Sequence, residues 1–309
     1  MDRAAWAQFG FRSSEPRGQA WRDIYFTNRD GLRLYGRHYP ASSPAERRPA
    51  VCLPGLTRNS RDFHDLALAL SAVGPGSRDV YTLDYRGRGR SEHDKDWRNY
   101  SPYIEMLDVL DFLAREELSR VAMIGTSRGG IIAMVMGAFR PTAIGAVVLN
   151  DIGPVLEKEG LVRIMGYVGR QPVPDTWERA AEAIRRASEQ HFPDLPDELW
   201  LEVAHQLFND ANGRPSRGYD YALGRVFTLS DLKKGLPPLW PQFLSLGRVP
   251  LFAIRGANSD LLSAKTLEEM AARHPRMRSL TVSGQGHAPL LKDFETNTAI
   301  ATFLAEHDR

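Results

Sequence analysis

The sequence predicts an α/β protein with a doubly wound, mostly parallel sheet and an inserted helical cap. Short apolar runs typical of strands alternate with segments of helical spacing over residues 50–150, and parallel strands need such crossover connections. The alternation stops over residues 155–245, which are dense in helical patterns and large apolar side chains, and it resumes at Pro250. We therefore expect residues 1–154 and 246–309 to form the core and residues 155–245 to form the cap.

Composition limits the classes of partner. The 309 residues suffice for one large domain with an insertion, and 40 basic against 38 acidic residues leave a net charge of +2. The basic residues are spread along the chain, so we expect no nucleic-acid partner. The longest clear apolar run, Ile131–Phe139, is far below the roughly 20 residues that cross a bilayer, so we expect no membrane partner.

Cysteine usage and the N-terminus indicate the compartment. The single cysteine, Cys52, excludes an internal disulfide, and Met1–Trp6 lacks the apolar stretch of a secretory signal. Residues 1–20 carry no motif and are expected to lie as an arm on the surface. A cytoplasmic location is the simplest interpretation, and a homodimer is compatible with the sequence.

The order of expected elements follows from periodicity and turn residues. An antiparallel hairpin over Asp23–Tyr39 turns at Asp30-Gly31. The expected strands after it are Ala50–Leu53, Asp79–Asp84, Val121–Ile124, Ala143–Leu149, Pro250–Arg255 and Arg278–Val282. The expected helices are Asp62–Ala72, Ser101–Glu117, the run from Ile131, Thr176–Gln190, Pro196–Phe208, Ala264–His274 and Leu291–Glu306.

One stretch carries the strongest chemical signal. An apolar strand stops at Gly125, Ser127 stands between Gly125 and Gly129, and an apolar helix begins at once. A serine on so sharp a turn needs flanking positions without a Cβ, since strand and helix must pass closely. This Gly-x-Ser-x-Gly stretch resembles the nucleophile elbow of the α/β-hydrolase family. An ordinary turn serine is the alternative interpretation.

The resemblance extends to two partners for Ser127. Asp260 follows the strand Pro250–Arg255, and His287 lies in Gly284-Gln285-Gly286-His287 after the last strand, so both should lie at the functional edge of the sheet. The order serine, acid, histidine is that of the family. The resemblance implies that Ser127 is the nucleophile, that His287 is the general base and that Asp260 orients the imidazole. Asp151 also ends a strand and is a rival for the acid; a turn residue is its other interpretation.

The resemblance also implies an oxyanion hole made by the backbone N–H groups of Leu56 and Arg128. Many relatives have His-Gly before the first position and Met, Gln or Leu at the second, but backbone donors survive such changes. Arg58 and Arg128 border these loops and could receive a substrate carboxylate, although salt bridges with nearby acids are the simpler interpretation. Tyr219 and Trp240 are candidates to line the pocket.

The predicted function is that of a serine hydrolase that cleaves a small to medium carboxylic ester or lactone through an acyl-enzyme. Carbon-carbon bond hydrolysis of a ring-cleavage dienoate by the same triad is one alternative. A slow or non-catalytic ligand-binding relative is another. The histidines show no metal-ligand spacing, and neither a metal nor a cofactor is expected.

Overall fold

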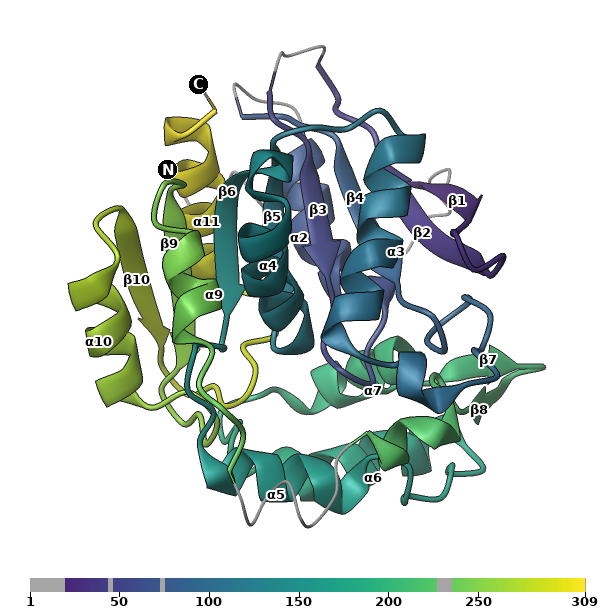
Figure 1. The fold of residues 1–309 in the computed structure, drawn as a ribbon. Coiled ribbons are helices and arrows are strands. Elements are labelled where there is room, and N and C mark those ends of the chain that lie inside the picture. The colour runs from purple at the N-terminus through teal and green to yellow at the C-terminus, as the bar shows by residue number, and fades with distance from the viewer. Residues whose placement is uncertain (1–19, 44–46, 73–75, 227–234, 309) are drawn as a thin grey trace.

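The computed structural model describes residues 20–43, 47–72, 76–226 and 235–308, so the expected arm over residues 1–20 lies almost entirely outside the described residues. An eight-stranded sheet has the strand order β1-β2-β4-β3-β5-β6-β9-β10. β2 is antiparallel to β1 and β4, and every other neighbouring pair in this sheet is parallel. Helices cover both faces, with α3, α4 and α9 on one and α2 and α11 on the other (Figure 1). The predicted fold class is confirmed.

The strands and helices that the sequence predicts for the core occur in the predicted order, and their first and last residues lie close to the predicted ones. The strands of the large sheet are β1 (Arg22–Thr27), β2 (Arg33–Tyr39), β3 (Ala50–Leu53), β4 (Val80–Asp84), β5 (Val121–Thr126), β6 (Ile144–Asn150), β9 (Leu251–Gly256) and β10 (Met277–Val282). The helices of the core are α2 (His64–Ser71), α3 (Pro102–Arg115), α4 (Arg128–Phe139), α9 (Trp240–Ser245), α10 (Ala264–Arg273) and α11 (Phe294–Glu306). Short 3₁₀ turns are η1 (Ser60–Phe63), η2 (Trp97–Asn99), η3 (Pro141–Ala143) and η4 (Tyr221–Arg225).

Burial explains why the central strands are apolar throughout. All seven residues of β6 and all four of β3 are buried, as expected for parallel strands covered on both faces.

α3 begins where the sequence predicts, because the Ser101 hydroxyl accepts a hydrogen bond from the Ile104 N–H at 3.3 Å and Pro102 is the first helical residue.

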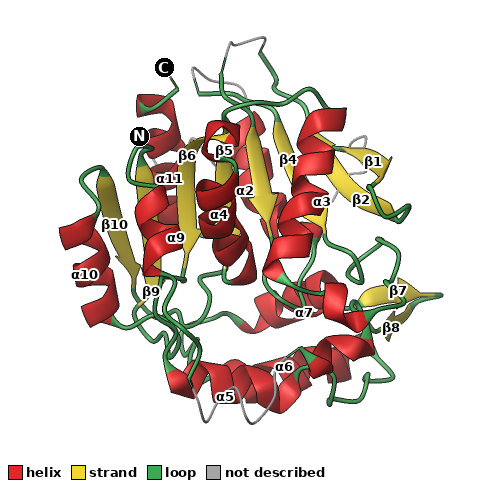
Figure 2. Ribbon diagram, viewed as in Figure 1, coloured by secondary structure: helices red, strands yellow, loops and turns green. Residues whose placement is uncertain are grey.

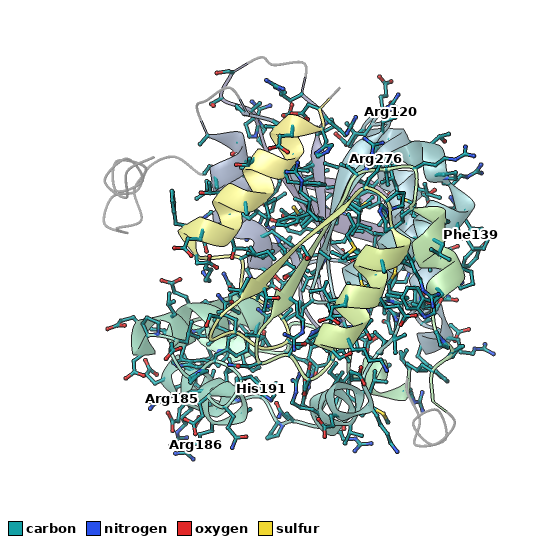
Figure 3. The ribbon with its side chains drawn as sticks, turned by 90° about the vertical axis from the view of Figure 1, so that its left-hand side faces the viewer. Arg120, Phe139, Arg185, Arg186, His191 and Arg276 are labelled. Atoms are coloured by element: carbon teal, nitrogen blue, oxygen red, sulfur yellow. The ribbon has the colours of Figure 1, made fainter. Side chains whose placement is uncertain are left out.

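The segment after β6 leaves the sheet and crosses the carboxyl ends of its strands as the cap (Figure 2). Its elements are α5 (Lys158–Tyr167), α6 (Trp177–Ser188), α7 (Asp197–Leu207), β7 (Asn209–Ala211) and β8 (Arg214–Ser216). Figure 3 shows Arg185, Arg186 and His191 of the cap at one end of the molecule. Arg120 and Arg276, which precede β5 and β10, lie at the opposite end.

Two details of the cap differ from the sequence prediction. The region was expected to lack strands, yet β7 and β8 pair as a small antiparallel hairpin around Asn212-Gly213. The expected boundary at residue 245 also assigns α9 to the cap, whereas α9 packs on α4 of the core (Figure 1). A Cβ at Gly137 of α4 would collide with Leu246, just after α9, so the two segments touch through a position that has no side chain.

Polar contacts attach the cap to the core. Arg61 donates hydrogen bonds to the carbonyl oxygens of Gln206 and Phe208, at 3.1 and 3.0 Å, and so satisfies the C-terminal end of α7. The Lys292 ammonium lies between Asp65 of the core, at 2.6 Å, and Glu202 of α7, at 3.1 Å. These contacts hold α7 over the sheet edge where the predicted site residues gather.

Among the described residues, no helix is both long enough and apolar enough to cross a bilayer.

Candidate active site

The Ser127 turn has the strained geometry that the sequence predicts. Ser127 has φ +50° and ψ −108° between β5 and α4, a conformation unusual for a residue with a side chain. A Cβ at Gly125 would collide with the Gly129 backbone, and a Cβ at Gly129 would collide with the carbonyl group of Leu53. The two glycines are therefore required by close backbone approach on both sides of the serine.

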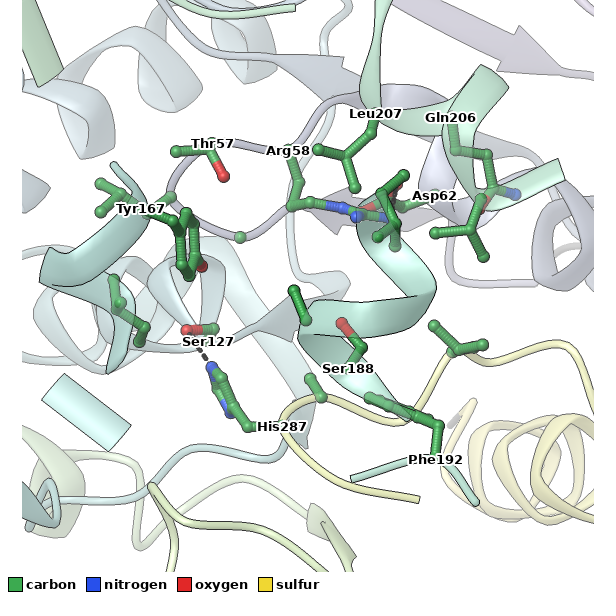
Figure 4. A pocket seen from close by; sticks show the side chains of 18 of the residues that line it. Thr57, Arg58, Asp62, Ser127, Tyr167, Ser188, Phe192, Gln206, Leu207 and His287 are labelled. Atoms are coloured by element: carbon green, nitrogen blue, oxygen red, sulfur yellow. Dashed lines mark hydrogen bonds and ion pairs between the residues drawn. The ribbon is translucent and has the colours of Figure 1, made fainter. Parts of the chain in front are cut away.

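Ser127 and His287 meet as predicted. His287 Nε2 lies 2.9 Å from Ser127 Oγ, and His287 Nδ1 lies 2.8 Å from Asp151 Oδ2. An ionised carboxylate can only accept, so Nδ1 carries the proton and Nε2 is left to accept from the serine hydroxyl. The three side chains thus form one directed chain of hydrogen bonds that ends at Ser127 (Figure 4 shows the serine and the histidine).

The acid beside His287 is Asp151, which corrects the prediction of Asp260. Asp151 follows β6 directly with φ +54°, a turn that points its fully buried carboxylate at the imidazole. Its Oδ1 accepts from the Gly256 N–H at 2.7 Å, and its Oδ2 accepts from the Ser259 hydroxyl at 2.6 Å. The loop expected to supply the acid therefore supplies two donors that hold the rival carboxylate in place.

Asp260 has a different partner. Four residues past the end of β9, its carboxylate accepts two hydrogen bonds from Arg163 of α5, at 2.6 and 2.8 Å. Burial raises the pKa of Asp260, but the hydrogen bonds and charge of Arg163 outweigh burial and hold it below its usual value. Asp260 therefore contributes an ion pair between the core and the cap.

The loop after β3 passes beside the serine. A Cβ at Gly55 would lie 3.9 Å from Ser127 Cβ, so Gly55, the residue before Leu56, lies beside the serine. Arg88 Nε donates to the Leu56 carbonyl oxygen at 2.8 Å and so fixes the orientation of this loop. Within the described part of the chain, the backbone N–H groups of Leu56 and Arg128 have no acceptor. Neither group is thus engaged by another acceptor there.

A cavity of about 370 Å³ opens above Ser127 and His287 between the core and the cap. Its wall is mostly apolar, with large side chains from α6, α7, the loop between them and the residue after α7: Ile184, Phe192, Leu195, Trp200, Val203, Leu207 and Phe208. Tyr167 of α5 also lines it, and in Figure 4 its hydroxyl end is directed toward Ser127. Burial raises the pKa of Tyr167, although the nearby positive charges of Arg163 and Arg58 oppose this, so the hydroxyl stays protonated at neutral pH.

Arg58 lines the cavity, but it is paired with Asp62 at 2.6 and 2.8 Å. The other predicted carboxylate receptor, Arg128, does not line the cavity. Its guanidinium is buried outside it, where it donates to Glu105 and to the Tyr100 carbonyl oxygen, each at 2.7 Å. The carboxylate hypothesis for Arg128 is therefore wrong.

Neither predicted pocket aromatic lines the cavity. The Tyr219 hydroxyl accepts a hydrogen bond from the Gly169 N–H at 3.2 Å inside the cap. Trp240 begins α9, where it packs edge-on against Phe243 and under the Arg273 guanidinium, 4.1 Å from the ring centre. Five other residues line the cavity although the sequence analysis did not propose them as pocket residues: Asp62, Arg163, Tyr167, Phe192 and Trp200. The helices that contain Asp62 and Trp200 were predicted, but not which side of them faces the serine; α5, which carries Arg163 and Tyr167, was not predicted, and Phe192 lies in the loop between α6 and α7.

No group of three or more histidine, cysteine, aspartate or glutamate side chains that could bind a metal ion occurs in the described ranges. The geometry instead supports nucleophilic chemistry at an activated serine.

A parallel sheet with a strained serine turn, a hydrogen-bonded histidine and a buried aspartate defines a hydrolase-type site. Residues 50–299 match the model of the alpha/beta hydrolase family, which is most of the chain. The protein belongs to this family and is an enzyme of the hydrolase class.

Similarity to individual hydrolases supports the assignment to this family. The crystal structure of an alpha/beta hydrolase from Novosphingobium aromaticivorans is similar at a TM-score of 0.84 and 39% identity, over 93% of this chain and 99% of that one. A 3-hydroxybutyrate-oligomer hydrolase from Cupriavidus necator is 32% identical over 257 residues, 81% of this chain and 86% of that protein. An sn-1-specific diacylglycerol lipase from Xenopus tropicalis is 34% identical over 252 residues, covering 81% and 74% respectively.

Proposed function

We propose that the protein hydrolyses a small to medium carboxylic ester or lactone through an acyl-enzyme on Ser127. The hydrogen-bond chain from Asp151 through His287 to the Ser127 hydroxyl, at the floor of a mostly apolar cavity, is the observation that carries the proposal. The relatives support an ester bond as the target, because oligomers of 3-hydroxybutyrate and diacylglycerols are both esters.

The first half of the reaction forms the acyl-enzyme. His287 Nε2 takes the Ser127 proton as Oγ attacks the ester carbonyl carbon, and Asp151 stabilises the imidazolium that results. The developing oxyanion accepts hydrogen bonds from the backbone N–H groups of Leu56 and Arg128. His287 then gives its proton to the leaving alkoxide, so an alcohol departs and the acyl group stays on Oγ.

The second half repeats these steps with water. His287 accepts a proton from a water molecule that attacks the acyl carbonyl carbon, and the same two N–H groups bind the oxyanion. The proton returns to Ser127 Oγ as the ester bond to the enzyme breaks. The products are a carboxylic acid and the resting serine, and no cofactor takes part in any of these steps.

Hydrolysis of p-nitrophenyl esters from acetate to decanoate tests the proposal. We expect p-nitrophenol release with an optimum at short or medium chain length, because a cavity of about 370 Å³ lies at the small end of the range for ligand sites. A fluorophosphonate probe should label the protein once, at Ser127, as detected by peptide mass spectrometry. The Ser127→Ala variant serves as the control for both measurements.

A negative result in both measurements would decide against ester hydrolysis. Folded protein that neither releases p-nitrophenol nor reacts with the phosphonate would contradict the ester proposal. The two alternatives are then tested directly. Turnover of a ring-cleavage dienoate would assign carbon-carbon hydrolysis, and tight binding of a ligand without turnover would assign a receptor.

We also propose a cytoplasmic location. The one cysteine, Cys52, is fully buried and free, which is compatible with the cytoplasm.

A further inference from the structure

We infer that the Arg58–Asp62 pair, whose two charges cancel, is a polar subsite of the cavity that receives a hydroxyl group on the acyl chain of the substrate. The inference rests on the proposed ester hydrolysis and narrows its substrate class to hydroxyacyl esters.

The pair is preformed and faces the substrate space. Arg58 Nε donates to Asp62 Oδ2 at 2.6 Å and Arg58 Nη2 donates to Oδ1 at 2.8 Å, so the two side chains lie fork to fork. Both residues line the cavity, with side chains 22% and 15% exposed (Figure 4). Burial lowers the pKa of Arg58, but the charge of Asp62 and its hydrogen bonds more than offset this, so Arg58 stays protonated.

The subsite is close to the nucleophile. A Cβ at Gly55 would lie 3.9 Å from Ser127 Cβ and 3.2 Å from Arg58 Cγ, so one residue's width separates the serine from the base of the arginine side chain. The guanidinium then extends away from Ser127 toward Asp62 and Gln206 (Figure 4). An acyl chain bound to Ser127 that extends along the Arg58 side chain therefore leads to the pair.

The remaining hydrogen-bonding capacity suits a hydroxyl. Arg58 Nη1 makes no hydrogen bond within the described part of the chain, while the Asp62 oxygens keep free lone pairs. A donor and an acceptor thus lie side by side in a mostly apolar cavity, and a hydroxyl can use both. A carboxylate gains little from this site, because Asp62 cancels the positive charge of Arg58 and repels a second anion.

A second ion pair borders the cavity but differs in one respect. Of Arg163 and Asp260, only Arg163 lines the cavity, so that pair presents donors to the cavity but no carboxylate. The Arg58–Asp62 pair presents both partners, which is why the hydroxyl is assigned to it.

The test compares methyl esters that differ at one substituent. Methanol release is measured with methyl butyrate, with both enantiomers of methyl 3-hydroxybutyrate, and with monomethyl succinate, which carries a carboxylate. We expect kcat/KM for the better hydroxy ester to exceed that for methyl butyrate at least about tenfold, since a partly buried pair that an apolar chain covers without a hydrogen-bonding partner is costly. We expect monomethyl succinate to be a poor substrate.

Removing one charge should redirect this preference. In Asp62→Asn the Arg58 charge is no longer cancelled, so the ratio of kcat/KM for monomethyl succinate over methyl butyrate should rise at least about tenfold. The exposed Asp175–Arg179 pair of the cap has the same spacing and does not line the cavity. Asp175→Asn is therefore the matched control and should leave both substrate ratios unchanged.

A double variant covers the case in which an uncancelled, partly buried charge prevents folding. Arg58→Met with Asp62→Leu removes both charges together, and the ratio for hydroxy ester over methyl butyrate should fall to about one. Equal rates for the two esters in the unsubstituted enzyme overturn the inference and leave the ester proposal standing. A preference for the hydroxy ester over methyl butyrate that persists in the double variant also overturns the inference and leaves the ester proposal standing. Absence of Ser127-dependent hydrolysis of every ester, with no phosphonate labelling, refutes the ester proposal and this inference with it.

Discussion

Replacing Asp151 by asparagine is expected to lower kcat for ester hydrolysis about 10⁴-fold, while leaving the fold intact. The asparagine amide can donate to His287 Nδ1, which would put the imidazole proton on Nε2 and remove the acceptor for the Ser127 hydroxyl. The effect should appear in kcat, because Asp151 is fully buried and does not line the cavity. Steady-state kinetics with a p-nitrophenyl ester measure it.

Asp260→Asn is the matched comparison, since both acids follow neighbouring strands of one sheet edge. It weakens the ion pair with Arg163 but leaves the hydrogen bond between Asp151 and His287 in place. We expect kcat within about tenfold of the unsubstituted enzyme, since this carboxylate does not contact the imidazole. If Asp260→Asn loses as much activity as Asp151→Asn, the assignment of the acid to Asp151 is wrong.

Gly129→Ala is expected to destabilise the fold by more than about 4 kcal/mol, among the largest effects of a single methyl group. The added Cβ would overlap the Leu53 carbonyl group, and neither α4 nor β3 can move away because both are buried in the core. The shift of the urea or thermal unfolding midpoint, followed by circular dichroism, measures the loss.

Gly166→Ala is the control for this substitution. Gly166 also lies in a helix, α5, but a Cβ there has no atom within 4 Å. Alanine should therefore stabilise the protein by about 0.5–1 kcal/mol, through the better helix propensity alone. A Gly129→Ala variant as stable as Gly166→Ala would contradict the close approach described for the serine turn.

Local sequence patterns were enough to predict the elements that position Ser127 and His287. The strand, the glycine-flanked serine and the apolar helix all lie between Val121 and Phe139, and each is set by short-range steric demands. The alternation of strands and helices likewise predicted the parallel sheet, because few other arrangements connect such elements.

The choice between Asp151 and Asp260 needed information that spacing does not contain. β6 and β9 are neighbours in the sheet, so both acids reach the same edge, and the distinction depends on one positive φ and on the partner of each carboxylate. In retrospect, an acid directly at the end of its strand is the better candidate than one four residues beyond it.

The cap residues were the least predictable part. Composition indicated an aromatic cap, but Tyr219 and Trp240 pack within protein while Tyr167, Phe192 and Trp200 line the cavity. Only tertiary packing decides which side of a helix faces a cavity. The hairpin at Asn212-Gly213 had a sequence signal, since Asn-Gly favours a two-residue turn, and the prediction overlooked it.

The start of α4 immediately after Ser127 has an electrostatic consequence. The aligned peptide dipoles of this twelve-residue helix place a partial positive charge at its first turn, where the oxyanion of the proposed reaction forms. No acidic side chain in that turn opposes this field, and its surroundings are largely buried, which reduces screening by water. Because the field comes from the main chain, Arg128 can stand where relatives carry other side chains without weakening it.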